Sequence, residues 1–88
     1  MKYPLFCVRD VKVGFGQPMV HMSDQVAIRD FSYKINQPNS LMDAFPGDFD
    51  LYQVGVFDTD SGEIEKCLPV FIISGKDVYG DSYGEVHR

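Results

Sequence analysis

Two apolar, β-rich runs joined by an acidic turn most constrain what this chain can fold into. The first run, Leu51 to Asp58, has apolar side chains on both faces, which is typical of a strand with neighbours on two sides. The turn, Asp58 to Gly62, leads into a second run, Glu63 to Ile73. This pattern predicts a β-hairpin whose first strand is central in a small sheet. Pro69 lacks a backbone N–H, so it confines the second strand to a sheet edge or breaks it there.

The beginning of the chain predicts a second pair of strands. Pro4 to Val13 is apolar at first and then alternates with charge, which indicates a strand. Gly14 to Pro18 is a turn, and Met19 to Met22 is a short strand expected to pair with the first. The Gly-Phe-Gly sequence could cradle phosphate, but no GK[ST] motif follows it. A turn that exposes Phe15 is therefore the stronger interpretation.

One amphipathic helix of about four turns is expected next. Ser23 is placed to cap its N-terminus, and Pro38 ends it. Four apolar residues recur on one stripe of this helix: Ala27, Ile28, Phe31 and Ile35. Leu41 to Gly47 then connects the helix to the central strand through a short helical turn.

These elements predict an α+β domain of ββαββ order over residues 1–75. Its antiparallel sheet has about four strands, and the amphipathic helix packs on it. Residues 76–88 are rich in Gly, Tyr and acids and are expected to form a flexible C-terminal tail. The sequence does not decide between an open sheet and a closed barrel. Twelve aromatic residues are many for one domain of 88 residues, which favours a homodimer.

The cysteines and the hydropathy pattern indicate a cytoplasmic protein. Cys7 and Cys67 lie in apolar runs without a CxxC partner, so we expect two buried, reduced thiols. The N-terminus lacks the long apolar region of a signal peptide. No run approaches ~20 apolar residues, the length that a membrane span needs.

Few residues support an enzymatic function. His21 and His87 stand alone, and no spacing indicates a nucleophile with its base. Asp58 to Gly62 resembles the start of a calcium loop, but it lacks the glycine at the sixth position. Pro69 also stands where the twelfth-position glutamate belongs. We therefore expect no catalysis, no metal and no cofactor, and a hairpin turn with Gly62 in the left-handed region.

The net charge of −5 is unevenly distributed. Residues 1–44 carry five cations and four acids, whereas residues 45–88 carry three cations and nine acids. Single-stranded nucleic acid is bound by cations along its backbone and by rings that stack on its bases. The residues that could form such a surface on one side are Arg9, Lys12, Phe15, Arg29, Tyr33 and Lys34. A solvated helix face and an ordinary strand end are the alternative interpretation.

The helix and the central strand carry a resemblance to a known family. The matching residues are Val26-Ala27-Ile28-Arg29-Asp30-Phe31, then Pro46, then Asp48-Phe49-x-Leu51-Tyr52-x-Val54-Gly55-x-Phe57-Asp58, then Gly62. In length and motif order, over roughly residues 5–70, the chain is similar to the small nonstructural protein of gokushoviruses. These are tailless icosahedral phages of the Microviridae with single-stranded DNA genomes.

The resemblance implies a protein that is absent from the virion and acts in the infected bacterial cytoplasm. It also implies a DNA-binding factor for genome replication or for the packaging of single strands, with no catalytic residues. Arg29, the one basic position in the matched helix motif, is the first choice for a phosphate contact. We expect non-specific binding of single-stranded DNA as a dimer. The alternative is a non-catalytic interaction module that contacts a phage replication or capsid-assembly protein.

Overall fold

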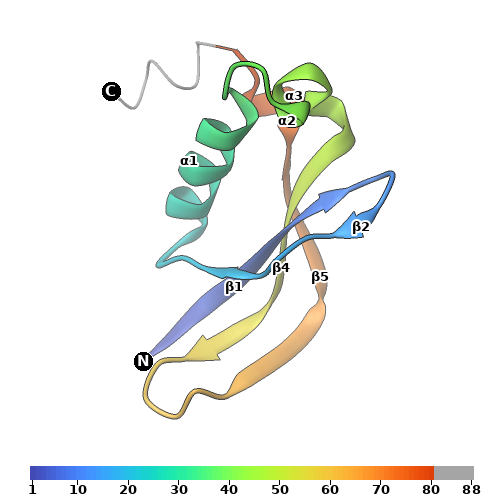
Figure 1. Ribbon diagram of the computed structural model, residues 1–88. Helices are drawn as coiled ribbons and strands as arrows, with labels where there is room; N and C mark the ends of the chain where they lie inside the picture. Colours follow the sequence, from blue (N-terminus) through green and yellow to red (C-terminus); the bar gives the residue numbers. More distant parts are fainter. Residues whose placement is uncertain (81–88) are drawn as a thin grey trace.

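The sheet is built around the hairpin at the centre of the chain, with β4 lying between β1 and β5 (Figure 1). The computed structural model describes residues 1–80. The elements are, in order, β1 (Lys2–Asp10), β2 (Gly14–Phe15), β3 (Met19–Val20), α1 (Asp24–Ile35), α2 (Leu41–Ala44), the 3₁₀ turn η1 (Pro46–Asp48), β4 (Phe49–Asp58), β5 (Ile64–Ser74) and α3 (Gly75–Val78). The predicted α+β class is confirmed, with one long helix and a single antiparallel sheet.

The strands are joined in the order β2-β1-β4-β5, and β3 pairs with β1 beside β2. The predicted pairing of the short strand with the first is confirmed, since Met19 lies opposite Phe6. β5 has one neighbour, so Pro69 does lie in an edge strand. Within residues 1–80 the sheet is curled but open, because the end strands β2 and β5 do not pair with each other.

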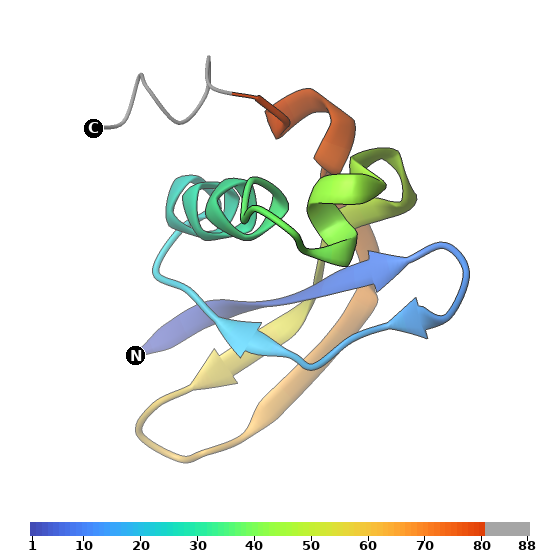
Figure 2. The same cartoon turned by 45° about the horizontal axis from the view of Figure 1, so that its top comes forward.

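α1 lies across one face of the sheet (Figures 1 and 2). Its N-terminus is capped as predicted, because the Ser23 hydroxyl accepts a hydrogen bond from the Val26 N–H at 3.2 Å. The helix ends at Ile35, three residues before Pro38, and its 12 residues make slightly more than three turns rather than the expected four. The core between α1 and the sheet consists of Phe6, Ala27, Phe31, Ile35, Phe49, Leu51 and Val78, of which Ala27, Phe31 and Ile35 come from α1 itself. Burial of these apolar side chains holds the helix on the sheet.

The packed fold continues beyond the boundary expected at residue 75. α3 follows directly on β5, and its Val78 is fully buried in the core. Gly75 permits this turn, because a Cβ at that position would overlap the Pro46 carbonyl oxygen. The expected start of the tail is therefore corrected to a position after Val78. Residues 81–88, on which the rest of that prediction falls, lie outside the described part of the chain.

The environment of Cys67 is a second correction. Cys7 is buried as expected, whereas Cys67 is exposed. Cys67 lies in an edge strand whose residues 64–71 are all exposed, and in a bulge where three residues of β5, Cys67 to Pro69, stand opposite Val54 alone. The hairpin turn itself agrees with the prediction, because Gly62 has a φ of 77°.

Candidate nucleic-acid interface

Three aromatic rings form a row across the sheet. Phe15 on β2 packs edge to face against Tyr52 on β4, with ring centroids 5.4 Å apart. Tyr52 packs in the same way against Phe71 on β5 at 5.8 Å. The guanidinium of Arg9 lies over the Phe15 ring, 5.9 Å from its centroid, within range of a cation–π interaction. These four residues, Arg9, Phe15, Tyr52 and Phe71, are called the ring row below.

Strand register places the ring row on one face of the sheet. Its directly opposed pairs, which share a face, are Arg9 with Phe15 and Tyr52 with Phe71. The core residues Phe6 on β1 and Leu51 on β4 alternate with them and therefore point to the other face, toward α1. Because α1 packs on one face of the sheet (Figure 2), the register puts the ring row on the opposite face, which α1 leaves uncovered.

The outer rings of the row are open to solvent. Phe15 is 47% exposed and Phe71 54%, and Tyr52 between them is half-buried. Exposed rings held in place by neighbouring rings can stack on the bases of a single strand. Arg9 supplies a positive charge, but Asp50 lies opposite Arg9 on β4 and brings a negative charge to the same face. This surface suits stacking better than it suits the attraction of many phosphates.

The uncovered face also carries a cysteine, which is chemically quiet. Cys7 lies opposite Tyr52, and burial raises the pKa of its thiol, so the neutral form prevails at neutral pH. Among residues 1–80, no group of three or more His, Cys, Asp or Glu side chains is arranged to hold a metal ion. Absence of catalysis and of a cofactor stays a prediction.

Three of the predicted residues gather instead on the outer surface of α1. Arg29 and Tyr33 line a pocket of about 400 Å³ together with His21 and Asp30. Lys34 Nζ lies 3.2 Å from the Asp30 carboxylate, which also lies 3.4 Å from His21 Nε2. Asp30 therefore offsets much of the charge of Lys34. Within the described residues, Arg29 has no ion-pair partner of its own.

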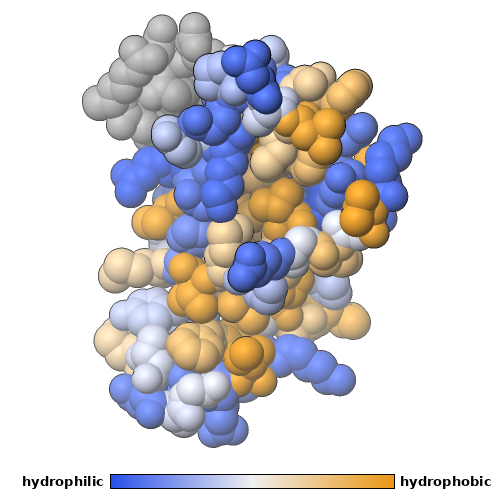
Figure 3. Space-filling model, in the orientation of Figure 1, coloured by the Kyte–Doolittle hydropathy of each residue, from blue (hydrophilic) through white to orange (hydrophobic). Residues whose placement is uncertain are grey.

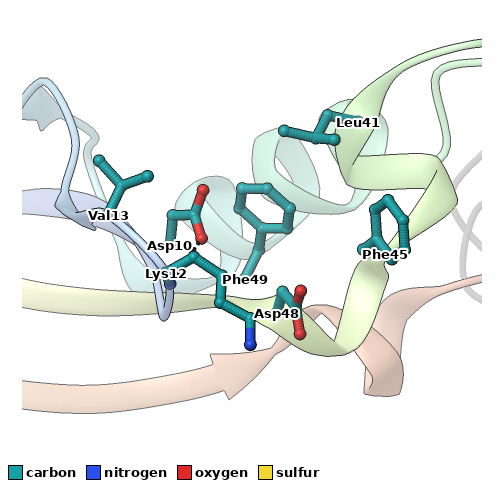
Figure 4. Close-up of a pocket in the computed structure, with 7 residues that line it drawn as sticks. All are labelled: Asp10, Lys12, Val13, Leu41, Phe45, Asp48 and Phe49. Carbon is teal, nitrogen blue, oxygen red and sulfur yellow. Dashed lines mark hydrogen bonds between the residues drawn. The ribbon is translucent and has the colours of Figure 1, made fainter.

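Lys12 lies apart from both surfaces, in the turn after β1. It lines a pocket of about 370 Å³ between this turn and α2 (Figure 4). Three exposed apolar side chains form much of the wall: Val13, Leu41 and Phe45. Apolar surface lies over α2 and is mixed with hydrophilic surface at the turn, whereas the surface over α1 is mostly hydrophilic (Figure 3). The carboxylates of Asp10 and Asp48 flank the pocket.

The six predicted residues thus fall into three groups rather than on one side. Arg9 and Phe15 are together in the ring row, Arg29, Tyr33 and Lys34 are together on α1, and Lys12 is alone. Sequence reasoning missed Tyr52 and Phe71, which lie in the two strands of the predicted hairpin. The available signal was an aromatic residue in each strand of the hairpin, but only the register shows that these two side chains meet.

The observations define a class: a small α+β protein whose uncovered sheet face carries a row of rings and an arginine. Residues 3–78 match the model of a family described as phage ORF5 protein. The match covers most of the chain, so the chain belongs to this family of phage proteins. Neither a curated protein nor a solved structure matches the chain. Within residues 1–80, no helix is long and apolar enough to cross a membrane.

Proposed function

We propose that this chain is a nonstructural protein of a gokushovirus-like phage of the Microviridae, and that it binds single-stranded DNA as a dimer without sequence preference. It acts in the cytoplasm of the infected bacterium, in genome replication or in the packaging of single strands, and performs no catalysis. Membership of a phage family supports the phage part of this proposal. The ring row is the observation that carries the DNA-binding part.

Binding relies on stacking in this proposal. A base stacked on an aromatic side chain contributes about 1–3 kcal/mol, and any base can do so, which removes sequence preference. Arg9 is the only cation of the ring row, and the chain as a whole carries a charge of −5. Each phosphate neutralised on a single strand contributes about −0.7 to the slope of log affinity against log salt. We therefore expect a shallow slope of about −0.7 per protomer.

The test is fluorescence anisotropy of a labelled oligothymidylate across a salt series. The double variant Phe15→Ala/Phe71→Ala removes the two exposed rings and is expected to weaken binding by more than about tenfold. Tyr33→Ala is the matched control, because Tyr33 is a 67%-exposed ring on α1. Absence of binding at low salt by folded wild-type protein would overturn the proposal. Equal losses in both variants would remove the special role of the ring row.

A second candidate function is the capture of a phage replication or capsid-assembly protein. The pocket between the β1–β2 turn and α2 favours it, because Leu41 and Phe45 are 63% and 55% exposed around an apolar cavity. Leu41→Glu is expected to abolish co-purification with the phage's initiator or capsid protein while leaving DNA binding unchanged. Unaltered co-purification would exclude this pocket as the contact.

A further inference from the structure

β5 exposes an apolar edge along most of its length. Every residue from 61 to 71 is exposed. Four large apolar side chains in this stretch are more than half exposed: Ile64, Leu68, Val70 and Phe71. Edge strands of soluble monomers are normally short, charged or covered, because a long apolar edge attracts another chain. β5, orange in Figure 1, is eleven residues long and pairs on one side only.

The bulge in β5 determines how a partner could approach. It carries Leu68, whose 87% exposure is the highest of any large apolar side chain in residues 1–80. Pro69, the next residue, cannot donate a backbone hydrogen bond. A continuous ladder of backbone hydrogen bonds with another strand is therefore interrupted here. A partner at this edge makes side-chain contacts around Leu68 instead.

Charge and symmetry identify the partner as a second copy of this chain. Residues 64–71 carry one acid and one base, Glu65 and Lys66, so this segment adds no net charge of its own to a contact between two copies of a protein with a charge of −5. A contact of this edge with itself is isologous and uses up the edge in both copies. The opposite edge consists of two strands of two residues each, which gives further copies little to pair with. Association therefore stops at two copies.

We propose that residues 64–71 of β5 form the interface of a homodimer whose two-fold axis passes close to Cys67 and Leu68. Ile64, Leu68 and Val70 of each copy become buried against the other. Phe71 belongs to the ring row and also lies on this edge, so the two ring rows approach each other across the axis. This interface specifies the dimer of the proposed function, and its test needs no DNA.

The native cysteines provide the first test. Cys67 is exposed and near the axis, whereas Cys7 is buried. A short bismaleimide is expected to convert wild-type and Cys7→Ser protein into covalent dimers. At the same protein concentration, the Cys67→Ser variant is expected to remain uncrosslinked. A crosslinked fraction that reaches a plateau with added reagent, and that does not fall when the protein is diluted, supports the interface. Wild-type protein that remains uncrosslinked while a monomaleimide labels Cys67 fully would overturn it.

The second test compares two exposed apolar positions. Leu68→Glu places a charge at the centre of the interface, whereas Val13→Glu changes an 85%-exposed residue in the distant β1–β2 turn. Neither side chain supports the fold, so both variants should remain folded by circular dichroism. Leu68→Glu is expected to raise the dimer dissociation constant more than about tenfold, and Val13→Glu to leave it unchanged.

Light scattering without DNA is the readout, with the monomer at 10.0 kDa. A wild-type monomer at all concentrations, or a Leu68→Glu variant that dimerises as the wild type does, would overturn the interface. A dimer that binds no DNA would leave the interface standing and refute the proposed function alone. DNA binding by a monomer would overturn the interface and the dimer, and would leave only the DNA-binding part of the proposed function standing.

Discussion

The uncovered sheet face and the outer surface of α1 both combine cations with aromatic side chains. The two surfaces differ in which side chains lie next to those cations and rings. On α1, the positions one turn apart bring Asp30 against Lys34, and the charge is offset within the helix itself. On the sheet, paired strands bring rings against rings and Arg9 against a ring. Composition alone does not distinguish the two surfaces. What distinguishes them is which residues the helix period and the strand register make adjacent.

The largest expected contrast is between a buried and an exposed phenylalanine on opposite sides of the sheet. Phe31, on the sheet-facing side of α1, is 1% exposed, whereas Phe71 in the ring row is 54% exposed. Phe31→Ala is expected to lower the free energy of unfolding by about 3–5 kcal/mol, because it leaves a cavity in the core. Phe71→Ala is expected to lower it by about 1 kcal/mol or less. Urea denaturation followed by circular dichroism measures both.

The same pair of variants separates stability from binding. Phe71→Ala is expected to lose DNA affinity at a small loss of stability, so the uncovered face would serve binding and the covered face would serve folding. A loss of several kcal/mol in Phe71→Ala would instead make the ring row part of the core. In that case the distinction between the two faces would not hold.

The next contrast concerns the two arginines, one on each surface. Arg9→Gln is expected to weaken binding of single-stranded DNA and to flatten the log–log salt slope by about 0.7, because one phosphate contact is lost. Arg29→Gln is expected to change the slope little if the strand follows the sheet. Anisotropy titrations of both variants over the same salt series decide between the surfaces. A flatter slope in Arg29→Gln with an unchanged one in Arg9→Gln would move the site to α1.

The sequence was sufficient for the elements whose signals are local. The Ser23 cap, the apolar stripe of α1 and the glycine in the hairpin turn each depend on a few neighbouring residues, and all three are confirmed. The central position of β4 and the edge position of β5 were also predicted, the latter because a proline excludes a central strand.

The sequence does not predict which face of the sheet α1 covers. For this reason the six predicted site residues were expected on one side, whereas the structure places them in three groups. β1 carries apolar residues on both faces, Leu5 and Cys7 on one and Phe6 and Val8 on the other. Alternation shows that Arg9 and Phe6 point in opposite directions, but either face could have received α1. The bulge around Cys67 and the burial of Val78 are likewise properties of the assembled fold.

The smallest expected effect concerns pH, and it compares the hairpin turn with the N-terminus of α1. A charged carboxylate accepts the hydrogen bond in the turn, whereas a neutral hydroxyl accepts it at the helix. The Asp58 carboxylate accepts the Asp60 N–H at 2.9 Å, and this hydrogen bond lowers the pKa of Asp58. A lowered pKa stabilises the folded state above the unfolded-state value of about 3.9, and this contribution disappears as the pH falls through the folded-state pKa. The helix cap, Ser23, carries no titratable group.

Asp58→Asn is therefore expected to be less sensitive than the wild type to acidification from neutral pH to pH values below the unfolded-state pKa of about 3.9. Ser23→Ala should lose about 1 kcal/mol at every pH and retain the wild-type pH dependence, because only a neutral hydrogen bond is removed. Urea midpoints at neutral and acidic pH give both quantities. Identical pH dependence in wild-type and Asp58→Asn protein would show that the charge of the Asp58 carboxylate does not stabilise the turn.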